Sequence, residues 1–437
     1  MTKKKNEKLQ NSMRLEVWQI LTKVFTNHGQ SHVLLNRWVQ NHKTLTDRDK
    51  NFVFQLVHGT LTWQPYLDFL TRQLVHPQRT PLSVQVLLWM SLYQFYFMDR
   101  VPNYAVVNEA VEIAKDQFPP YAKLVNGSLQ NALRREGFHS LETLAKEKPT
   151  SCYFALKYAF PQILYTKLKN DFGQEIAEKI MADSLNKPRY SFRLNTLKCP
   201  SQDIFSNLGL NPEEVYQGLT DESFWTTNPK AIQTLLNQGF LTIQDQASIL
   251  VAKTLLADNL SSDLKIWDMC AAPGGKLTHL AALMKNQGLI LATEINPQKI
   301  PFIEKNLKRL GVKNVQLKQQ DALCEPPLAN FDAILLDAPC SGLGVLKRKP
   351  EIKLNFDFKT LSDLTNTQAQ LLDQAAKHLK SGGQLVYSTC TLNPDENQKQ
   401  IAHFLQKHQD WKLLKEEQIF GFENKTDGFY IAKLQKK

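Results

Sequence analysis

The sequence is poor in cysteine and lacks the spacings that bind metals. Its 437 residues include six cysteines, and none forms a CxxC pair or a Cys/His cluster with zinc spacing. Neither a disulfide framework nor a metal site is therefore expected. Reduced thiols are typical of the cytoplasm, where we expect the protein to reside.

Long apolar runs are also absent. The most apolar segment, 84–98, is shorter than the ~20 residues that cross a bilayer, and Gln85, Ser91 and Gln94 interrupt it. It therefore predicts a buried helix. The basic residues 1–10 are not followed by an apolar run, so neither a secretory signal nor a membrane contact is expected.

Positive charge is in excess and is concentrated in the first third of the chain. The net charge is +11, and residues 1–150 hold 19 Lys/Arg against 12 Asp/Glu. The rest of the chain holds 34 against 30. A basic domain favours partners rich in phosphate, such as nucleic acids, although an ordinary solvated surface explains the same surplus.

The apolar pattern predicts three domains, 1–145, 146–240 and 241–437. The first shows helical spacing, and proline-rich turns interrupt it. In the second, 191–198 and 239–245 alternate like strands within a small α/β domain. In the third, short apolar runs alternate with amphipathic helices, which predicts a mainly parallel sheet with helices on both faces.

The predicted strands of the third domain end in polar residues that suit a nucleoside cofactor. Gly274 and Gly275 would let the backbone approach a ligand at a helix N-terminus. Glu294 could accept hydrogen bonds from ribose hydroxyls, and Asp321 could meet adenine. No GxGxxG fingerprint or Walker loop occurs, so a pyrophosphate is not expected. S-adenosylmethionine fits, although each acid alone would suit an ordinary loop.

Two cysteines follow neighbouring predicted strands, Cys340 in "APCSG" and Cys390 in "YSTCT". Because parallel strands end at one edge of a sheet, both thiols should approach one cleft, whereas most isolated cysteines are inert and buried. A thiolate that adds to carbon 6 of a pyrimidine activates carbon 5 toward a methyl group. Asp337 could bind cytosine, and Lys276 or a helix N-terminus could lower the thiol pKa. The position of the two thiols leaves open which of them attacks.

Three motifs resemble those of the RNA cytosine-5 methyltransferases, and in particular the bacterial Sun/Fmu type that modifies small-subunit ribosomal RNA. They are "DMCAAPGGKLTHLAALM", "LLDAPCSGLGVLKRKPEIK" and "YSTCTLNPDENQ". Segments 46–61, 101–115 and 124–134 resemble the helical RNA-binding domain of the antitermination factor NusB, which Sun/Fmu proteins carry in front of the catalytic part. The resemblance covers nearly the whole chain.

This resemblance implies an all-α NusB-like domain, a small α/β connecting domain and a Rossmann-like methyltransferase domain. It implies methylation of carbon 5 of a specific cytidine in 16S ribosomal RNA by a monomer that uses S-adenosylmethionine. Cys390 would be the nucleophile, Cys340 would assist breakdown of the covalent intermediate, and Asp337 would face both cytosine and cofactor. The implied cofactor residues are Cys270, Ala271, Ala272, Pro273, Gly274, Gly275, Lys276, Glu294, Asp321 and Asp337.

Two details depart from the usual family pattern. Glu294 stands where an aspartate is more frequent, and 347–353 varies an Arg-rich segment. Two other functions compete with the one implied. A DNA cytosine-5 methyltransferase would use Cys340, in its Pro-Cys loop, as the nucleophile. A non-catalytic RNA-binding or assembly factor would need only the NusB-like domain.

Overall fold

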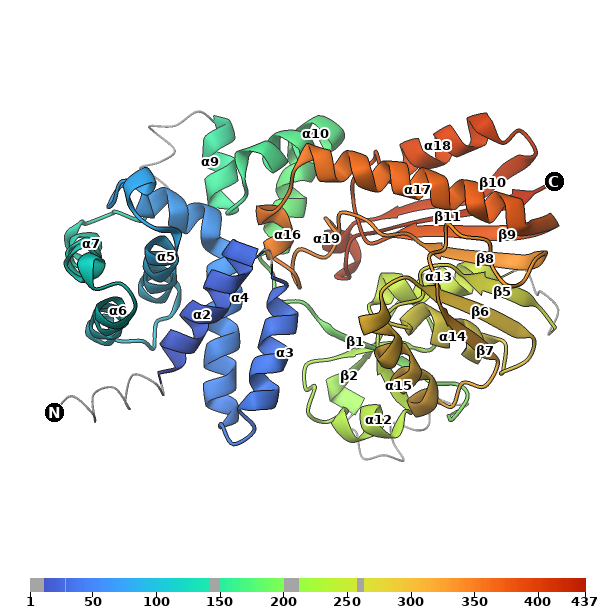
Figure 1. The fold of residues 1–437 in the computed structure, drawn as a ribbon, viewed down its shortest axis with the longest axis horizontal. Helices are drawn as coiled ribbons and strands as arrows, with labels where there is room; N and C mark the ends of the chain where they lie inside the picture. The colour runs from blue at the N-terminus through green and yellow to red at the C-terminus, as the bar shows by residue number, and fades with distance from the viewer. Residues whose placement is uncertain (1–11, 28, 141–149, 200–211, 258–262) are drawn as a thin grey trace. The chain divides into compact units, whose positions relative to one another are not determined.

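In the computed structural model, the first part of the chain is helical, and the rest forms two sheets together with further helices (Figure 1). The structure describes residues 12–27, 29–140, 150–199, 212–257 and 263–437. The chain forms two compact units. The helical unit consists of Met1–Leu185 and Arg348–Phe356, and the sheet unit of Asn186–Lys347 and Asp357–Lys437.

Capping residues and prolines set the bounds of the helices in the helical unit. Thr46 accepts a hydrogen bond from the Asp49 amide and so caps α4 (Asp47–Thr71). The apolar segment predicted as a buried helix forms α5 (Leu82–Phe97), and α6 (Asn103–Gln117) ends just before two prolines. The other helices are α2 (Met13–Asn27), α3 (Ser31–Asn41), α7 (Ala122–Arg134), α9 (Thr150–Lys157), α10 (Gln162–Ser184) and α16 (Glu351–Leu354).

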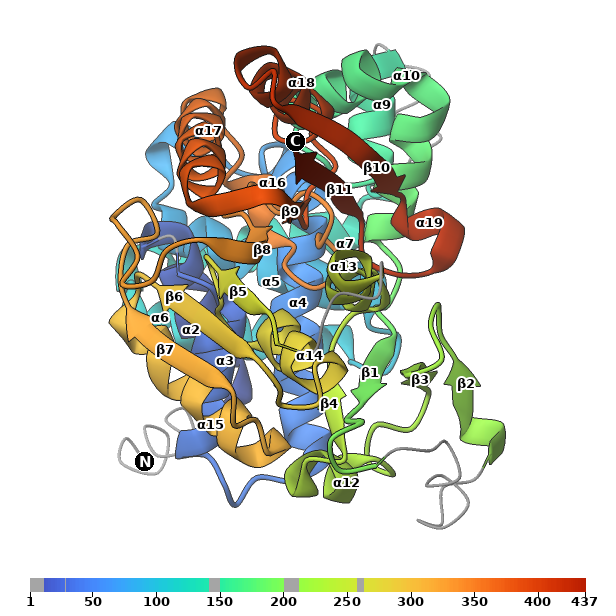
Figure 2. The same cartoon turned by 90° about the vertical axis from the view of Figure 1, so that its right-hand side faces the viewer.

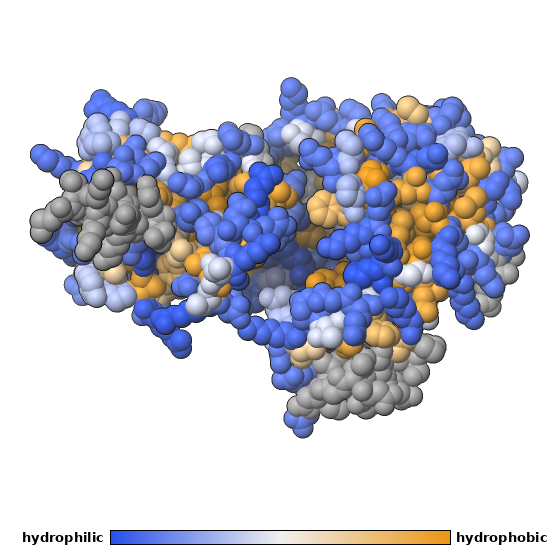
Figure 3. All heavy atoms as spheres, turned by 60° about the horizontal axis from the view of Figure 1, so that its bottom comes forward, coloured by the Kyte–Doolittle hydropathy of each residue, from blue (hydrophilic) through white to orange (hydrophobic). Residues whose placement is uncertain are grey.

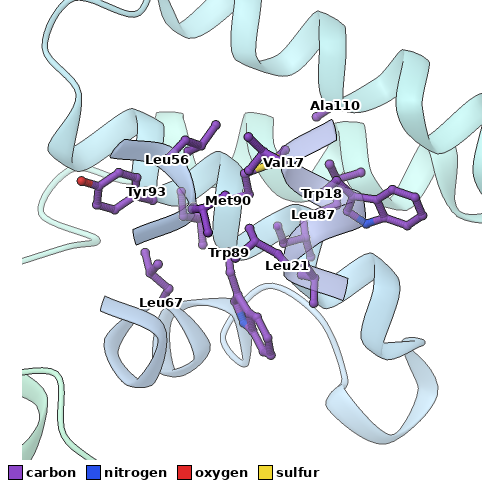
Figure 4. Packing of buried hydrophobic residues seen from close by; sticks show 14 of the residues in the cluster. Val17, Trp18, Leu21, Leu56, Leu67, Leu87, Trp89, Met90, Tyr93 and Ala110 are labelled. Atoms are coloured by element: carbon purple, nitrogen blue, oxygen red, sulfur yellow. The ribbon is translucent and has the colours of Figure 1, made fainter. Parts of the chain in front are cut away.

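The core of the helical unit forms around α5, as Figure 4 shows. Leu87 and Met90 of α5 are fully buried together with Leu21 of α2. The close approach of α4 to α5 requires a glycine at position 59, because a Cβ there would lie 1.9 Å from the ring of Tyr93. A helix that is apolar on every side is thus enclosed by its neighbours.

The sheet unit begins with a small antiparallel sheet of strand order β2-β3-β1-β4. Its elements are β1 (Tyr190–Leu194), β2 (Val215–Gln217), β3 (Ser223–Thr226), α12 (Gln233–Gln238) and β4 (Leu241–Ile243). The strands expected within 191–198 and 239–245 are therefore present but shorter. Helices α9 and α10 lie in the helical unit rather than with this sheet. The division into domains at 145 and 240 remains a prediction.

The large sheet has seven strands in the order β10-β11-β9-β8-β5-β6-β7. β5 to β9 run parallel, and β11 is antiparallel to both of its neighbours. The strands are β5 (Lys265–Asp268), β6 (Leu289–Glu294), β7 (Val315–Gln319), β8 (Phe331–Asp337), β9 (Leu379–Thr389), β10 (Trp411–Ile419) and β11 (Phe429–Lys436). The strand order reverses between β5 and β8, and ligands of such sheets bind at this switch point.

Helices cover both faces of the large sheet (Figures 1 and 2). Ile334 and Leu336 of β8 pack in the cluster that includes residues of two helices, α17 (Phe358–His378) and α18 (Gln398–Lys407). The alternate residues Ala333 and Leu335 pack with the opposite layer. That layer contains α13 (Gln246–Leu256), α14 (Gly275–Leu283) and α15 (Ile300–Leu310). Side chains that alternate along a strand thus serve two cores.

Hydrophilic side chains cover most of the face drawn in Figure 3, and apolar side chains form smaller patches on it. Among the described residues, no helix combines the length and the apolar character that a membrane span requires.

Candidate active site

A glycine loop joins β5 to α14 at the switch point. β5 ends at Asp268 and α14 begins at Gly275. Gly274 has a φ of 98°, a left-handed conformation that favours glycine. The first amides of α14 have no intrahelical partners, so the loop offers hydrogen-bond donors to a ligand.

The acidic residues predicted at strand ends lie at the same edge of the sheet. Glu294 is the last residue of β6 and is 5% exposed, and its Oε1 accepts a hydrogen bond from the Asn296 amide at 2.9 Å. Asp337 is the last residue of β8. β7 ends at Gln319, so Asp321 lies in the following turn, where it accepts from the Leu323 amide.

Asp268, the last residue of β5, was missed as a site residue by sequence reasoning. Its side chain is 1% exposed, and neither carboxylate oxygen has a well-formed hydrogen bond among the described residues. Burial raises the pKa of Asp268 to about 8, and the charge of Asp337 adds to the rise. The strand-end rule that found Glu294 applies equally to Asp268. A buried carboxylate beside the glycine loop whose oxygens have no well-formed hydrogen bond among the described residues fits a cationic ligand such as S-adenosylmethionine.

Asp337 is held by two neighbours. Lys276 Nζ donates to its Oδ2 at 2.8 Å, and Ser388 Oγ donates to its Oδ1 at 2.9 Å. Burial acts to lower the pKa of Lys276, but the charge of Asp337 and their hydrogen bond outweigh it, and the negative charge of Cys390 adds to the net rise. Lys276 is therefore a cation close to both Asp337 and Cys390.

The two cysteines that follow β8 and β9 are in contact. The register pairs Asp337 with Ser388 in adjacent parallel strands, and the two Sγ atoms of Cys340 and Cys390 lie 3.4 Å apart. The hydrogen bond to Cys390 raises the pKa of Cys340 well above its usual value, and burial and the charge of Cys390 add to this. These effects favour the protonated form of the Cys340 thiol where it meets Cys390.

Cys270, which also follows a strand end, is unsuited to attack. Burial raises the pKa of its thiol far above the usual value, and the charge of Asp268 adds to the rise. It packs against the cluster formed by β8, β9 and α17.

Among the described residues, no group of three or more His, Cys, Asp and Glu side chains could hold a metal ion.

Fold and site together define a class of protein. A doubly wound sheet with a glycine loop and acidic strand ends at its switch point is that of an S-adenosylmethionine-dependent methyltransferase. Family models agree with this class. Residues 255–435 match the family described as 16S rRNA methyltransferase RsmB/F, and residues 11–134 match the NusB family.

Curated relatives extend the match to almost the entire chain. One is the probable ribosomal RNA small subunit methyltransferase B of Bacillus subtilis, 33% identical over 98% of this chain and 99% of that protein. Another is the ribosomal RNA small subunit methyltransferase B of Escherichia coli, 32% identical over 98% of this chain and 100% of that protein. The chain therefore belongs to the RsmB/F methyltransferase family, which confirms the predicted resemblance.

Solved structures are similar as well. The structure titled PH0851 covers 97% of this chain and 98% of its own with a TM-score of 0.82, and at 23% identity it shows the shared fold. NSun6 from Pyrococcus horikoshii, solved with the S-adenosylmethionine analogue SFG, is 27% identical. It covers 64% of this chain and 99% of its own with a TM-score of 0.58. The predicted fold class and cofactor are thereby confirmed.

Proposed function

We propose that the protein methylates carbon 5 of one cytidine in 16S ribosomal RNA through a covalent bond between Cys390 and the cytosine. The observation that carries this proposal is the contact of Cys340 with Cys390 beside Asp337. An attack on carbon 6 needs a thiolate, and a cytosine needs a carboxylate that can accept from its exocyclic amine. Both groups lie at neighbouring strand ends.

S-adenosylmethionine would supply the methyl group as an electrophile when bound. Glu294 would accept hydrogen bonds from its ribose hydroxyls, and Asp321 would meet the adenine. The backbone of 270–276 would lie against the ligand, since Gly274 and Gly275 permit a close approach. The positive charge of the ligand would offset the buried carboxylate of Asp268, which has no well-formed hydrogen bond among the described residues.

Each thiol would have its own step. Cys390 would attack carbon 6 as the thiolate, and the bond between sulfur and carbon 6 would make carbon 5 nucleophilic. After carbon 5 gains the methyl group, a base removes the proton from carbon 5, and the bond between sulfur and carbon 6 breaks. Cys340, whose thiol stays protonated next to Cys390, would assist this elimination. Asp337 would hold the cytosine, which must first leave its stack.

The proposed partner is the ribosomal RNA of the small subunit. Support comes from the curated relatives, which are named for small-subunit ribosomal RNA, and from the basic first third of the chain with its NusB match. A protein that neutralises several phosphates binds RNA more weakly as salt rises. We also propose that the protein is a monomer and acts in the cytoplasm.

One experiment separates the proposal from its two rivals. Purified protein would be incubated with labelled S-adenosylmethionine and either protein-free 16S RNA or duplex DNA. We expect label in RNA, at carbon 5 of a single cytidine. Label in DNA would favour the DNA enzyme, and no transfer to naked RNA or to isolated small subunits would favour a non-catalytic factor. Mapping 5-methylcytidine in cells without the gene would identify the target.

A further inference from the structure

A buried carboxylate connects the two loops that carry the cysteines. Glu396 lies in the segment between β9 and α18, six residues after Cys390, and its side chain is fully buried. Its Oε1 accepts a hydrogen bond from the backbone amide of Ser341 at 2.8 Å. Its Oε2 accepts a second bond from the Ser341 hydroxyl. Ser341 directly follows Cys340, so the carboxylate reaches across to the loop of the other cysteine.

Two further donors complete the set around this carboxylate. Gln368 of α17 donates to Oε1 at 3.1 Å and also to the Pro339 carbonyl at 2.9 Å. Asn393 donates to Oε2 at 3.0 Å. The carboxylate thus joins the loop of Cys340, helix α17 and the loop of Cys390 at one point.

An ionised carboxylate can accept from all four donors at once. The two oxygens of Glu396 receive the Ser341 amide and hydroxyl and the amide groups of Gln368 and Asn393. A carboxylate is an acceptor at both oxygens, whereas a glutamine would turn one side into an NH₂ donor facing another N–H donor. A group left unsatisfied in this buried position is costly, so the neighbouring loop would have to move.

We propose that Glu396 is a positioning residue that sets the distance between the thiols of Cys340 and Cys390. It acts through Ser341, whose backbone amide and hydroxyl both donate to its carboxylate. It touches neither thiol in the described contacts. The negative charge of Glu396 also favours the protonated form of Cys340. This inference rests on the proposed function of the two cysteines.

The test compares Glu396→Gln with Glu222→Gln. Glu222 is another buried carboxylate of the sheet unit, with hydrogen bonds to Lys253 and His279, and has no part in the site. The first measurement is the rate at which the thiol oxidant diamide links Cys340 to Cys390, followed by mass spectrometry of the linked peptide. Methyl transfer to RNA, cofactor affinity by calorimetry and thermal melting are measured on the same samples.

For Glu396→Gln we expect linkage of the two thiols and methyl transfer to fall about 10- to 100-fold, the range for losing a hydrogen bond to a charged group. Cofactor affinity should stay within about twofold, because Glu396 contacts none of the proposed cofactor residues. A twofold change corresponds to well under the 1.4 kcal/mol of a tenfold change. Glu222→Gln should melt at a lower temperature and still link its thiols at the original rate. Ser341→Ala, which removes one donor, should shift linkage in the same direction by less.

Two results would overturn the inference. The first is a Glu396→Gln protein that links its thiols and methylates RNA like the original. The second is a loss of thiol linkage that also occurs in Glu222→Gln and that, in both variants, follows the drop in melting temperature. Glu396 would then only stabilise the fold. If Glu396→Gln does not fold, Ser341→Ala decides by the same measurements. Failure of the proposed function would look different, because thiol linkage does not depend on methyl transfer.

Discussion

The Sγ atoms of Cys340 and Cys390 lie 3.4 Å apart although 50 residues separate them in the chain. The contact exists because β8 and β9 are adjacent parallel strands whose carboxyl ends meet. Of the two thiols, Cys340 has its pKa raised well above the usual value by the hydrogen bond with Cys390 and by burial. This asymmetry supports separate roles for two residues that are chemically identical.

Alanine at each cysteine should give opposite products. Cys390→Ala should abolish methylation and form no covalent complex with RNA, because the attacking thiol is gone. Cys340→Ala should still attack and transfer the methyl group but stall before elimination. It should accumulate a protein–RNA complex that survives denaturing electrophoresis. The reverse pattern would assign the attack to Cys340, as in the DNA enzymes.

Glu294→Ala should weaken cofactor binding without unfolding the protein. The loss of hydrogen bonds to a charged acceptor costs ~1.5–3 kcal/mol, or roughly a tenfold to hundredfold weaker affinity. Calorimetry with S-adenosylmethionine measures this directly. Glu304→Ala is a matched control, because Glu304 lies exposed on α15. An unchanged affinity for Glu294→Ala would remove the residue from the site.

Asp268→Asn should stabilise the ligand-free protein at alkaline pH. Burial raises the pKa of Asp268 to about 8 in the fold, well above the 3.8 of an unperturbed aspartate. Between these two values the folded state binds the extra proton, so ionisation costs stability as pH rises toward 8. The melting temperature should rise by roughly 2–4 °C for each kcal/mol recovered, and by more at pH 9 than at pH 5.

The same substitution should weaken cofactor binding, since it removes the carboxylate that faces a cationic ligand. Calorimetry at pH 9, where the original carboxylate is ionised, gives the largest contrast. If the melting gain were equal at both pH values, Asp268 would have an ordinary pKa and no special part in the site.

Charge reversal on the helical unit should weaken RNA binding and leave cofactor binding intact. Deleting residues 1–145 is a poorer test, because Ser31 donates two hydrogen bonds to Glu351 of the later segment 348–356. A Lys115→Glu, Lys123→Glu double variant avoids this, since both lysines are exposed. Filter binding at several salt concentrations should show weaker affinity and a shallower salt slope for the variant. Equal slopes would place the RNA contacts elsewhere.

The edge strand β10 shows where sequence patterns fail. Trp411–Ile419 buries only its two end residues and exposes most of the charged residues between them. It therefore lacks the apolar alternation by which the parallel strands were predicted. The strands of the small sheet, β2 and β3, are three and four residues long, too short to show a period. In these strands, neither the length nor the burial pattern gives the strict alternation that a strand prediction needs.

Residues that lie next to one another along the chain carried the predictions that succeeded. The glycine loop, the acids at strand ends and the alternation of strand and helix are local patterns with a direct physical meaning, and they determined the family, the fold class and the cofactor. Glu294, Asp337 and Cys390 could be selected because a strand end is visible in the sequence. Their assigned roles stay predictions.

Tertiary structure decided what depends on distance through space. The contact between Cys340 and Cys390 and the four donors around Glu396 join strands, loops and a helix, and no spacing in the sequence encodes such a meeting. The high pKa of Asp268 likewise results from burial in the finished sheet, since the same residue in an open chain would be an ordinary acid. Local sequence determined which groups are available, and packing determined which of them meet.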